Sequence, residues 1–101
     1  MASDGRREEM DAKIKAWERE LERLRVALAR APESVHVQYY SQFVEVYREK
    51  EVVKSRWEAI RGVYRPEATE MERFQEALSA METTWATAQP MFAEVLKVVA
   101  A

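Results

Sequence analysis

Residues 10–32 read MDAKIKAWERELERLRVALARAP, and this stretch decides what kind of fold the chain can adopt. Its apolar side chains recur at alternating steps of four and three, at Met10, Ile14, Trp17, Leu21, Leu24, Leu28 and Ala31. This alternation is the heptad repeat by which α-helices pack along a narrow seam. Pro32 follows directly and lacks the backbone N–H that a helix interior needs. The stretch therefore predicts an amphipathic helix that ends just before Pro32.

The same heptad spacing returns twice further along the chain. The second seam consists of Tyr39, Phe43, Val46, Lys50, Val53, Trp57, Ile60 and Tyr64, and the third of Met71, Phe74, Leu78, Met81, Trp85, Ala88, Phe92, Val95 and Val99. Pro32 and the segment from Gly62 to Pro66 separate the three stretches. Pro90 interrupts the third stretch without changing its phase, so we expect a kink there. The sequence thus predicts one all-α domain over residues 1–101, with helices at about 4–31, 33–63 and 67–99.

Two topologies are compatible with this pattern. Three segments of similar length favour an antiparallel coiled-coil bundle, in which the apolar start of the second helix meets the apolar end of the third. The alternative is one long helix over residues 4–63, kinked at Pro32, with the third helix folded back as a hairpin and the chain dimeric. Proline inside a helix costs about 3 kcal/mol, and this cost favours the bundle.

Composition excludes several classes of function. The chain has 101 residues and no cysteine, so disulfides, thiolate metal sites and a cysteine nucleophile are excluded. A net charge of −2, with both signs interleaved along the helices, argues against nucleic acid as a partner. No apolar run approaches the roughly 20 residues that span a bilayer, and the charged start is unlike a secretory signal. We therefore expect a cytoplasmic protein.

The second helix is apolar on more than one side, because Val35, Val37, Tyr40, Val44 and Tyr47 add surface beside its seam. A helix of this kind usually has more than one neighbour. The first seam is narrow, as in a coiled coil, so we expect it to pack against a partner helix. We therefore predict a partner-binding surface, for a second copy of the chain or for another helical protein, made of Trp17, Leu21, Leu24, Leu28, Tyr39, Tyr40, Phe43 and Tyr47. Lys50 lies on the second seam, and we expect its stem to pack while its ammonium reaches solvent.

Catalytic and metal-binding chemistry has few candidate residues. The one histidine, His36, follows Glu33 in the Glu-x-x-His spacing that di-iron bundles use, so a metal-binding helical protein is one alternative. Ser34 and Ser41 lie near His36, but helical spacing does not make a triad of them. Without a glycine-rich loop there is no phosphate cradle. We expect no enzyme activity, no cofactor and no small-molecule substrate.

The residues Lys13-Ile14-Lys15-Ala16-Trp17 with Leu21 and Leu24, then Tyr39-Tyr40 with Gln42 and Phe43, and later Trp85 also carry a family resemblance. Over residues 10–95 the chain resembles short bacterial coiled-coil proteins that are often labelled stress-response proteins. Pro32 and Pro90 are departures from the pattern of that group, whose helices continue without interruption at these positions. The resemblance implies a structural class and no particular activity.

The function expected from the sequence is that of a non-enzymatic structural or protein-interaction module that binds helices through its heptad seams. A second alternative is an amphipathic protein that lies on a membrane surface or protects other molecules under stress. Residues 91–101 form an apolar tail that would suit a lipid interface.

Overall fold

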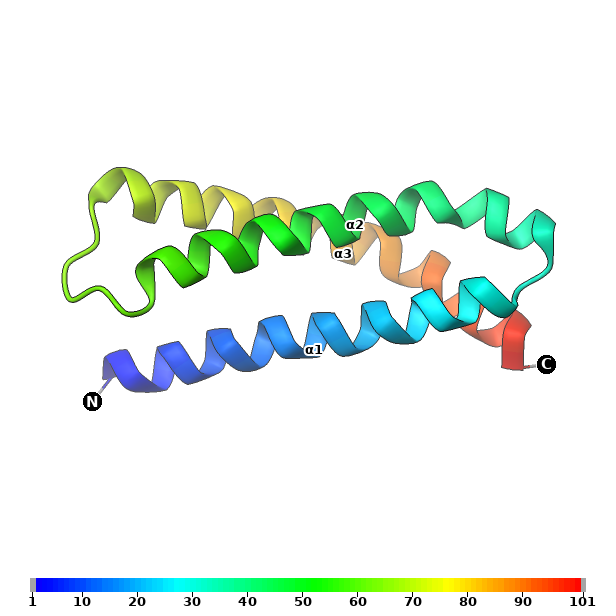
Figure 1. The fold of residues 1–101 in the computed structure, drawn as a ribbon, viewed down its shortest axis with the longest axis horizontal. Coiled ribbons are helices and arrows are strands. Elements are labelled where there is room, and N and C mark those ends of the chain that lie inside the picture. The colour runs from blue at the N-terminus through cyan, green and yellow to red at the C-terminus, as the bar shows by residue number, and fades with distance from the viewer. Residues whose placement is uncertain (1, 101) are drawn as a thin grey trace.

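The chain forms three long α-helices that run antiparallel to their neighbours in sequence (Figure 1). The computed structural model describes residues 2–100, with side chains from residue 5 onward. Helix α1 spans Ala2–Arg30, α2 spans Glu33–Ile60 and α3 spans Ala68–Ala100. The bundle is elongated, with principal extents of 49 × 24 × 18 Å. The predicted all-α three-helix bundle is confirmed, and the described part of the chain contains no strand.

A two-residue connection at Ala31 and Pro32 reverses the chain between α1 and α2. Pro32 has φ −54° and ψ 150°, an extended conformation that is incompatible with a helix passing through it. Its carbonyl accepts hydrogen bonds from the backbone N–H groups of Val35 and His36, both at 3.0 Å, which begins α2. The alternative of one long helix kinked at Pro32 is therefore wrong.

The second connection is longer and begins earlier than expected. Helix α2 ends at Ile60, where the N–H of Arg61 donates to the carbonyl of Trp57 at 2.8 Å. Tyr64 therefore lies in the connection and is 93% exposed, so its predicted place on the second seam is wrong. Beyond the connection, α3 remains one helix through Pro90, which lies exposed on its outer side.

All three helices contribute to one apolar core. The most deeply buried side chains all occupy heptad positions predicted from the sequence, namely Leu21, Leu24, Leu28, Val46, Val53, Met81 and Val95. Each such leucine or methionine contributes about 1.5–3 kcal/mol through removal of apolar surface from water. The side chain of Trp57 packs on Phe74 with ring centroids 5.2 Å apart, which joins α2 to α3.

Polar contacts at the edges of the core hold α1 against both neighbours. Lys13 pairs with Glu82 of α3 at 2.5 Å, and Glu18 pairs with Lys54 of α2 at 2.9 Å. In the part of the chain that the structure describes, no helix is long and apolar enough to cross a membrane.

Candidate functional site

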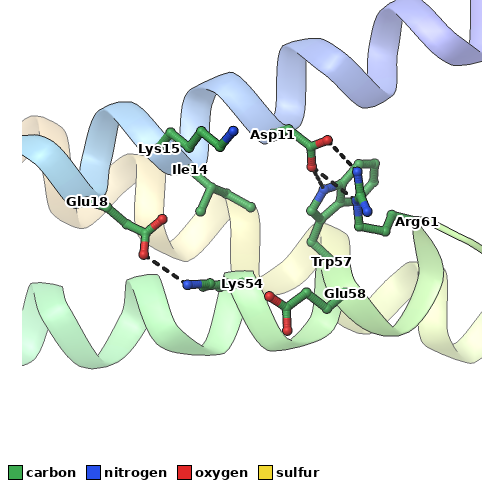
Figure 2. A pocket seen from close by; sticks show the side chains of 8 residues that line it. All are labelled: Asp11, Ile14, Lys15, Glu18, Lys54, Trp57, Glu58 and Arg61. Carbon is green, nitrogen blue, oxygen red and sulfur yellow. Dashed lines mark hydrogen bonds and ion pairs between the residues drawn. The ribbon is translucent and has the colours of Figure 1, made fainter.

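A charged groove lies between α1 and α2 near the end of the bundle that carries the longer connection (Figure 2). It has a volume of about 310 Å³ and is lined by Asp11, Ile14, Lys15, Glu18, Lys54, Trp57, Glu58 and Arg61. Residues of α1 form one wall and residues of α2 the other, so the groove exists only because the chain turns at Pro32. Its charged side chains make it the candidate site for chemistry.

The carboxylate of Asp11 is the most heavily bonded group in this groove. The indole Nε1–H of Trp57 donates to it at 2.7 Å, and Arg61 donates from Nη2 at 2.6 Å and from Nε at 3.2 Å (Figure 2). The hydrogen bond from Arg61, and after it the one from Trp57, lowers the pKa of Asp11 below its ordinary value. Asp11 is thus held as a carboxylate that ties the start of α1 to the end of α2.

The middle of the groove is closed by a second ion pair. Lys54 donates to Glu18 at 2.9 Å, and this hydrogen bond raises the pKa of the Lys54 ammonium. Each of these carboxylates therefore faces a cation, an arrangement that fixes the register of two helices. The charges of Lys15 and Glu58 line the same groove, and neither makes an ion pair with another described residue. Nothing in this geometry sets a nucleophile beside a base.

Lys50 differs from its sequence-based expectation. Its side chain is only 3% exposed, so the ammonium does not reach solvent and the expectation was wrong. The ammonium contacts the carboxylate of Glu51, lies 3.8 Å from Glu18 and sits 4.3 Å from the ring centroid of Tyr47. The hydrogen bond from Lys50 lowers the pKa of Glu51. Two carboxylates and an aromatic face thus compensate the ammonium for the water it loses.

His36 completes the turn at the opposite end of the α1–α2 contact. Its Nδ1 lies 3.0 Å from the carbonyl oxygen of Leu28, and because a carbonyl only accepts, Nδ1 carries the hydrogen. The ring stacks on Tyr40 at 4.9 Å between centroids. Glu33 is exposed, and the described residues contain no cluster of three or more side chains able to hold a metal ion. His36 therefore helps to cap the last turn of α1. Among the described residues, no third side chain joins Glu33 and His36 as a possible metal ligand.

The eight residues predicted to bind a partner fall into two groups. Trp17, Leu21, Leu24, Leu28 and Phe43 are buried in the core of the chain itself, with Tyr39 partly buried against them. Their seam already has its partners, which are α2 and α3, so in this fold they present little surface to a second molecule. Tyr40 and Tyr47 are the two that remain exposed.

These two tyrosines belong to a larger apolar stripe on α2, which we name the outer face. With Val37, which is exposed, and Val44, which is partly buried against the core, they recur at steps of three and four, so the four side chains share one side of the helix. Val52 continues the exposed apolar surface further along α2. Sequence reasoning noted the valines beside the seam but left them out of the predicted interface. The signal that could have found them is this second heptad stripe, displaced by one residue from the first.

Comparison of the chain with models of known families, with curated proteins and with solved structures found no match. The resemblance to short bacterial coiled-coil proteins therefore stays a prediction, and the functional argument depends on the geometry.

Proposed function

We propose that the chain is a non-enzymatic protein-interaction module that binds a helical partner through the outer face of α2. The observation that carries this proposal is the exposure of large apolar side chains on one side of a single helix. Val37 is 69% exposed, Tyr40 49% and Tyr47 45%. A stripe of exposed valines and tyrosines on a small bundle is typical of a binding surface.

The rings beside the outer face are ordered before any partner arrives. His36 stacks on Tyr40, Tyr40 lies 6.4 Å from Phe43, and Phe43 lies 6.1 Å from Tyr47, all between ring centroids. Phe43 is buried, so the row is anchored in the core. Side chains that are held in place lose less entropy on binding, and tyrosine is among the residues that contribute most to interfaces.

The spacing of the stripe suits a helix as the bound element. Side chains at steps of three and four form a ridge along α2, and a second helix accepts such a ridge between its own side chains. The charges on the same face are mixed, with Arg48 beside Glu51, whereas a helix that lies on anionic lipid usually carries a polar face rich in lysine and arginine. This mixture favours a protein partner, met in the cytoplasm, over a membrane surface.

Site-specific photocrosslinking tests the proposal. A photoreactive phenylalanine analogue placed at Tyr40 should form reproducible adducts with a protein in cells that naturally express the chain. The matched control is the same analogue at Tyr64, which is an exposed aromatic outside the outer face. We expect adducts at position 40 that are missing at position 64. Equal adducts at both positions, none at either, or adducts with lipid alone would contradict the proposal.

A further inference from the structure

We infer that the partner of the outer face of α2 is the same face of a second copy, with the two α2 helices antiparallel about a twofold axis between Glu49 and Lys50. This inference rests on the proposed function and names its partner. A twofold interface requires that one patch complement itself. The outer face meets that requirement in the size of its side chains and in their charge.

Size complementarity comes from the unequal halves of the face. Large side chains occupy the first half of this side of α2, at Val37, Tyr40 and Val44, and small ones occupy its second half, at Ser55 and Ala59. In the antiparallel pair, a residue that lies a given number of positions before the axis faces the residue of the second copy that lies the same number of positions after it. Val44 then faces Ser55 of the second copy, and Tyr40 faces Ala59. Each of these two large side chains meets a small one, as close helix packing requires.

Charge complementarity lies at the axis itself. The same alignment sets Arg48 of each copy opposite Glu51 of the other, and symmetry makes this pair twice. Both side chains are exposed, Arg48 makes no ion pair with another described residue, and Glu51 contacts Lys50 of its own chain through one of its two carboxylate oxygens. A parallel pair in register would instead set Arg48 against Arg48, which costs free energy. The charges therefore select the antiparallel arrangement.

The antiparallel pair also covers the remaining exposed apolar residues of α2. Tyr47 and Val52 lie on opposite borders of the outer face, so the antiparallel pair brings the two Tyr47 side chains together along one border and the two Val52 side chains together along the other. Val52 is 44% exposed and has no evident role within a single chain. Pairing along α2 covers Tyr40, Tyr47 and Val52, and the exposed side chain of Val37 lies beside the end of the second α2. The shape and charge of one face thus point to a second copy as its occupant.

Charge reversal tests the pairing, with sedimentation equilibrium as the measurement over micromolar to submillimolar concentrations. We expect the unmodified chain to dimerise. Arg48→Glu should raise the dissociation constant at least about tenfold, because two like-charged contacts replace two ion pairs. Arg48→Ala should raise the dissociation constant less than Arg48→Glu does, because it removes both ion pairs without creating like-charged contacts and leaves Glu51 beside Lys50.

The matched control is Arg23→Glu, an exposed reversal on α1 that should leave the dissociation constant unchanged. Circular dichroism of each variant verifies that the helices are intact. A strictly monomeric unmodified chain, or a dimer that ignores Arg48→Glu, would overturn this inference. The crosslinks at Tyr40 separate that failure from the failure of the proposed function: adducts with another protein keep the function, and adducts with the chain itself support the pairing.

Discussion

The inner and outer faces of α2 follow the same heptad spacing and meet opposite surroundings. On the inner face Val53 is completely buried, whereas its neighbour Val52 on the outer face is 44% exposed. The difference follows from the number of helices available. One side of α2 is covered by α1 and α3 together, and residues 2–100, which the structure describes, supply no further helix for the other side. Heptad spacing therefore identifies a surface suited to a helix without telling whether the chain itself supplies that helix.

The largest expected effect comes from Lys50, the one charged residue on the buried inner face. Lys50→Ala should lower the free energy of unfolding by about 2–4 kcal/mol, because the alanine leaves the space of a long side chain empty. Lys50→Met fills nearly the same space without a charge to desolvate, and should change stability by about 1 kcal/mol or less. Urea denaturation followed by circular dichroism measures both.

The two variants separate packing from charge at this position. If Lys50→Met proves as damaging as Lys50→Ala, the contacts of the ammonium with Glu51, Glu18 and Tyr47 stabilise the fold more than the packed stem does. The stability of the inner face would then depend on a buried ion cluster. The inner and outer faces would differ in their buried charge as well as in their burial.

The adjacent valines give the sharpest test of the comparison. Val53→Ala removes two buried methyl groups and should cost about 2 kcal/mol of unfolding free energy. Val52→Ala makes the same chemical change one residue earlier and should cost about 0.5 kcal/mol or less in the monomer. Thermal and urea unfolding at low protein concentration measure the pair. Equal losses of unfolding free energy would show that Val52 and Val53 are buried to similar extents.

The smallest expected effect is a pH dependence at the edge between the two faces, where Asp11 accepts hydrogen bonds from Arg61 and Trp57. Its pKa in the folded state is lowered from 3.8. The stabilisation is therefore complete above the unfolded-state pKa and is lost as the pH falls through the lower folded-state value. Asp11→Asn should destabilise the chain at neutral pH by an amount that shrinks below about pH 4.

Unfolding free energies of the unmodified chain and of Asp11→Asn, measured from pH 7 to pH 2.5, check this expectation. Glu9→Gln is the matched control, since Glu9 is an exposed carboxylate on the same helix with no ion pair to another described residue. A difference between Asp11→Asn and the unmodified chain that stays constant down to pH 2.5 would refute the role assigned to Asp11.

Much of the fold was predictable because heptad spacing and proline act locally. The seam from Ile14 to Leu28 could be read directly, and the cost of proline inside a helix favoured the turn at Pro32. The end of α2 was placed three residues late, because Gly62 and Pro66 mark a helix stop without locating its last hydrogen bond. Tyr64 was consequently assigned to a seam that had already ended.

The candidate site was less predictable, because it depends on how the helices are rotated against each other. The hydrogen bond between Asp11 and Trp57 joins residues 46 positions apart, and no local sequence pattern predicts it. Burial of Lys50 likewise depends on carboxylates from both α1 and α2 arriving at the same place. The division of the predicted interface into buried leucines and exposed tyrosines follows from the same rotation, which periodicity does not determine.

The chain carries one tryptophan in each helix, at Trp17, Trp57 and Trp85, and each ring has a different neighbour. Lys13 lies over Trp17, Asp11 accepts the indole hydrogen of Trp57, and Phe92 lies 6.3 Å from Trp85. Indole fluorescence responds to such surroundings, so variants that retain a single tryptophan would report on α1, α2 or α3 separately. The bundle thus contains its own set of optical probes, with which the order of helix docking during folding can be followed without any added label.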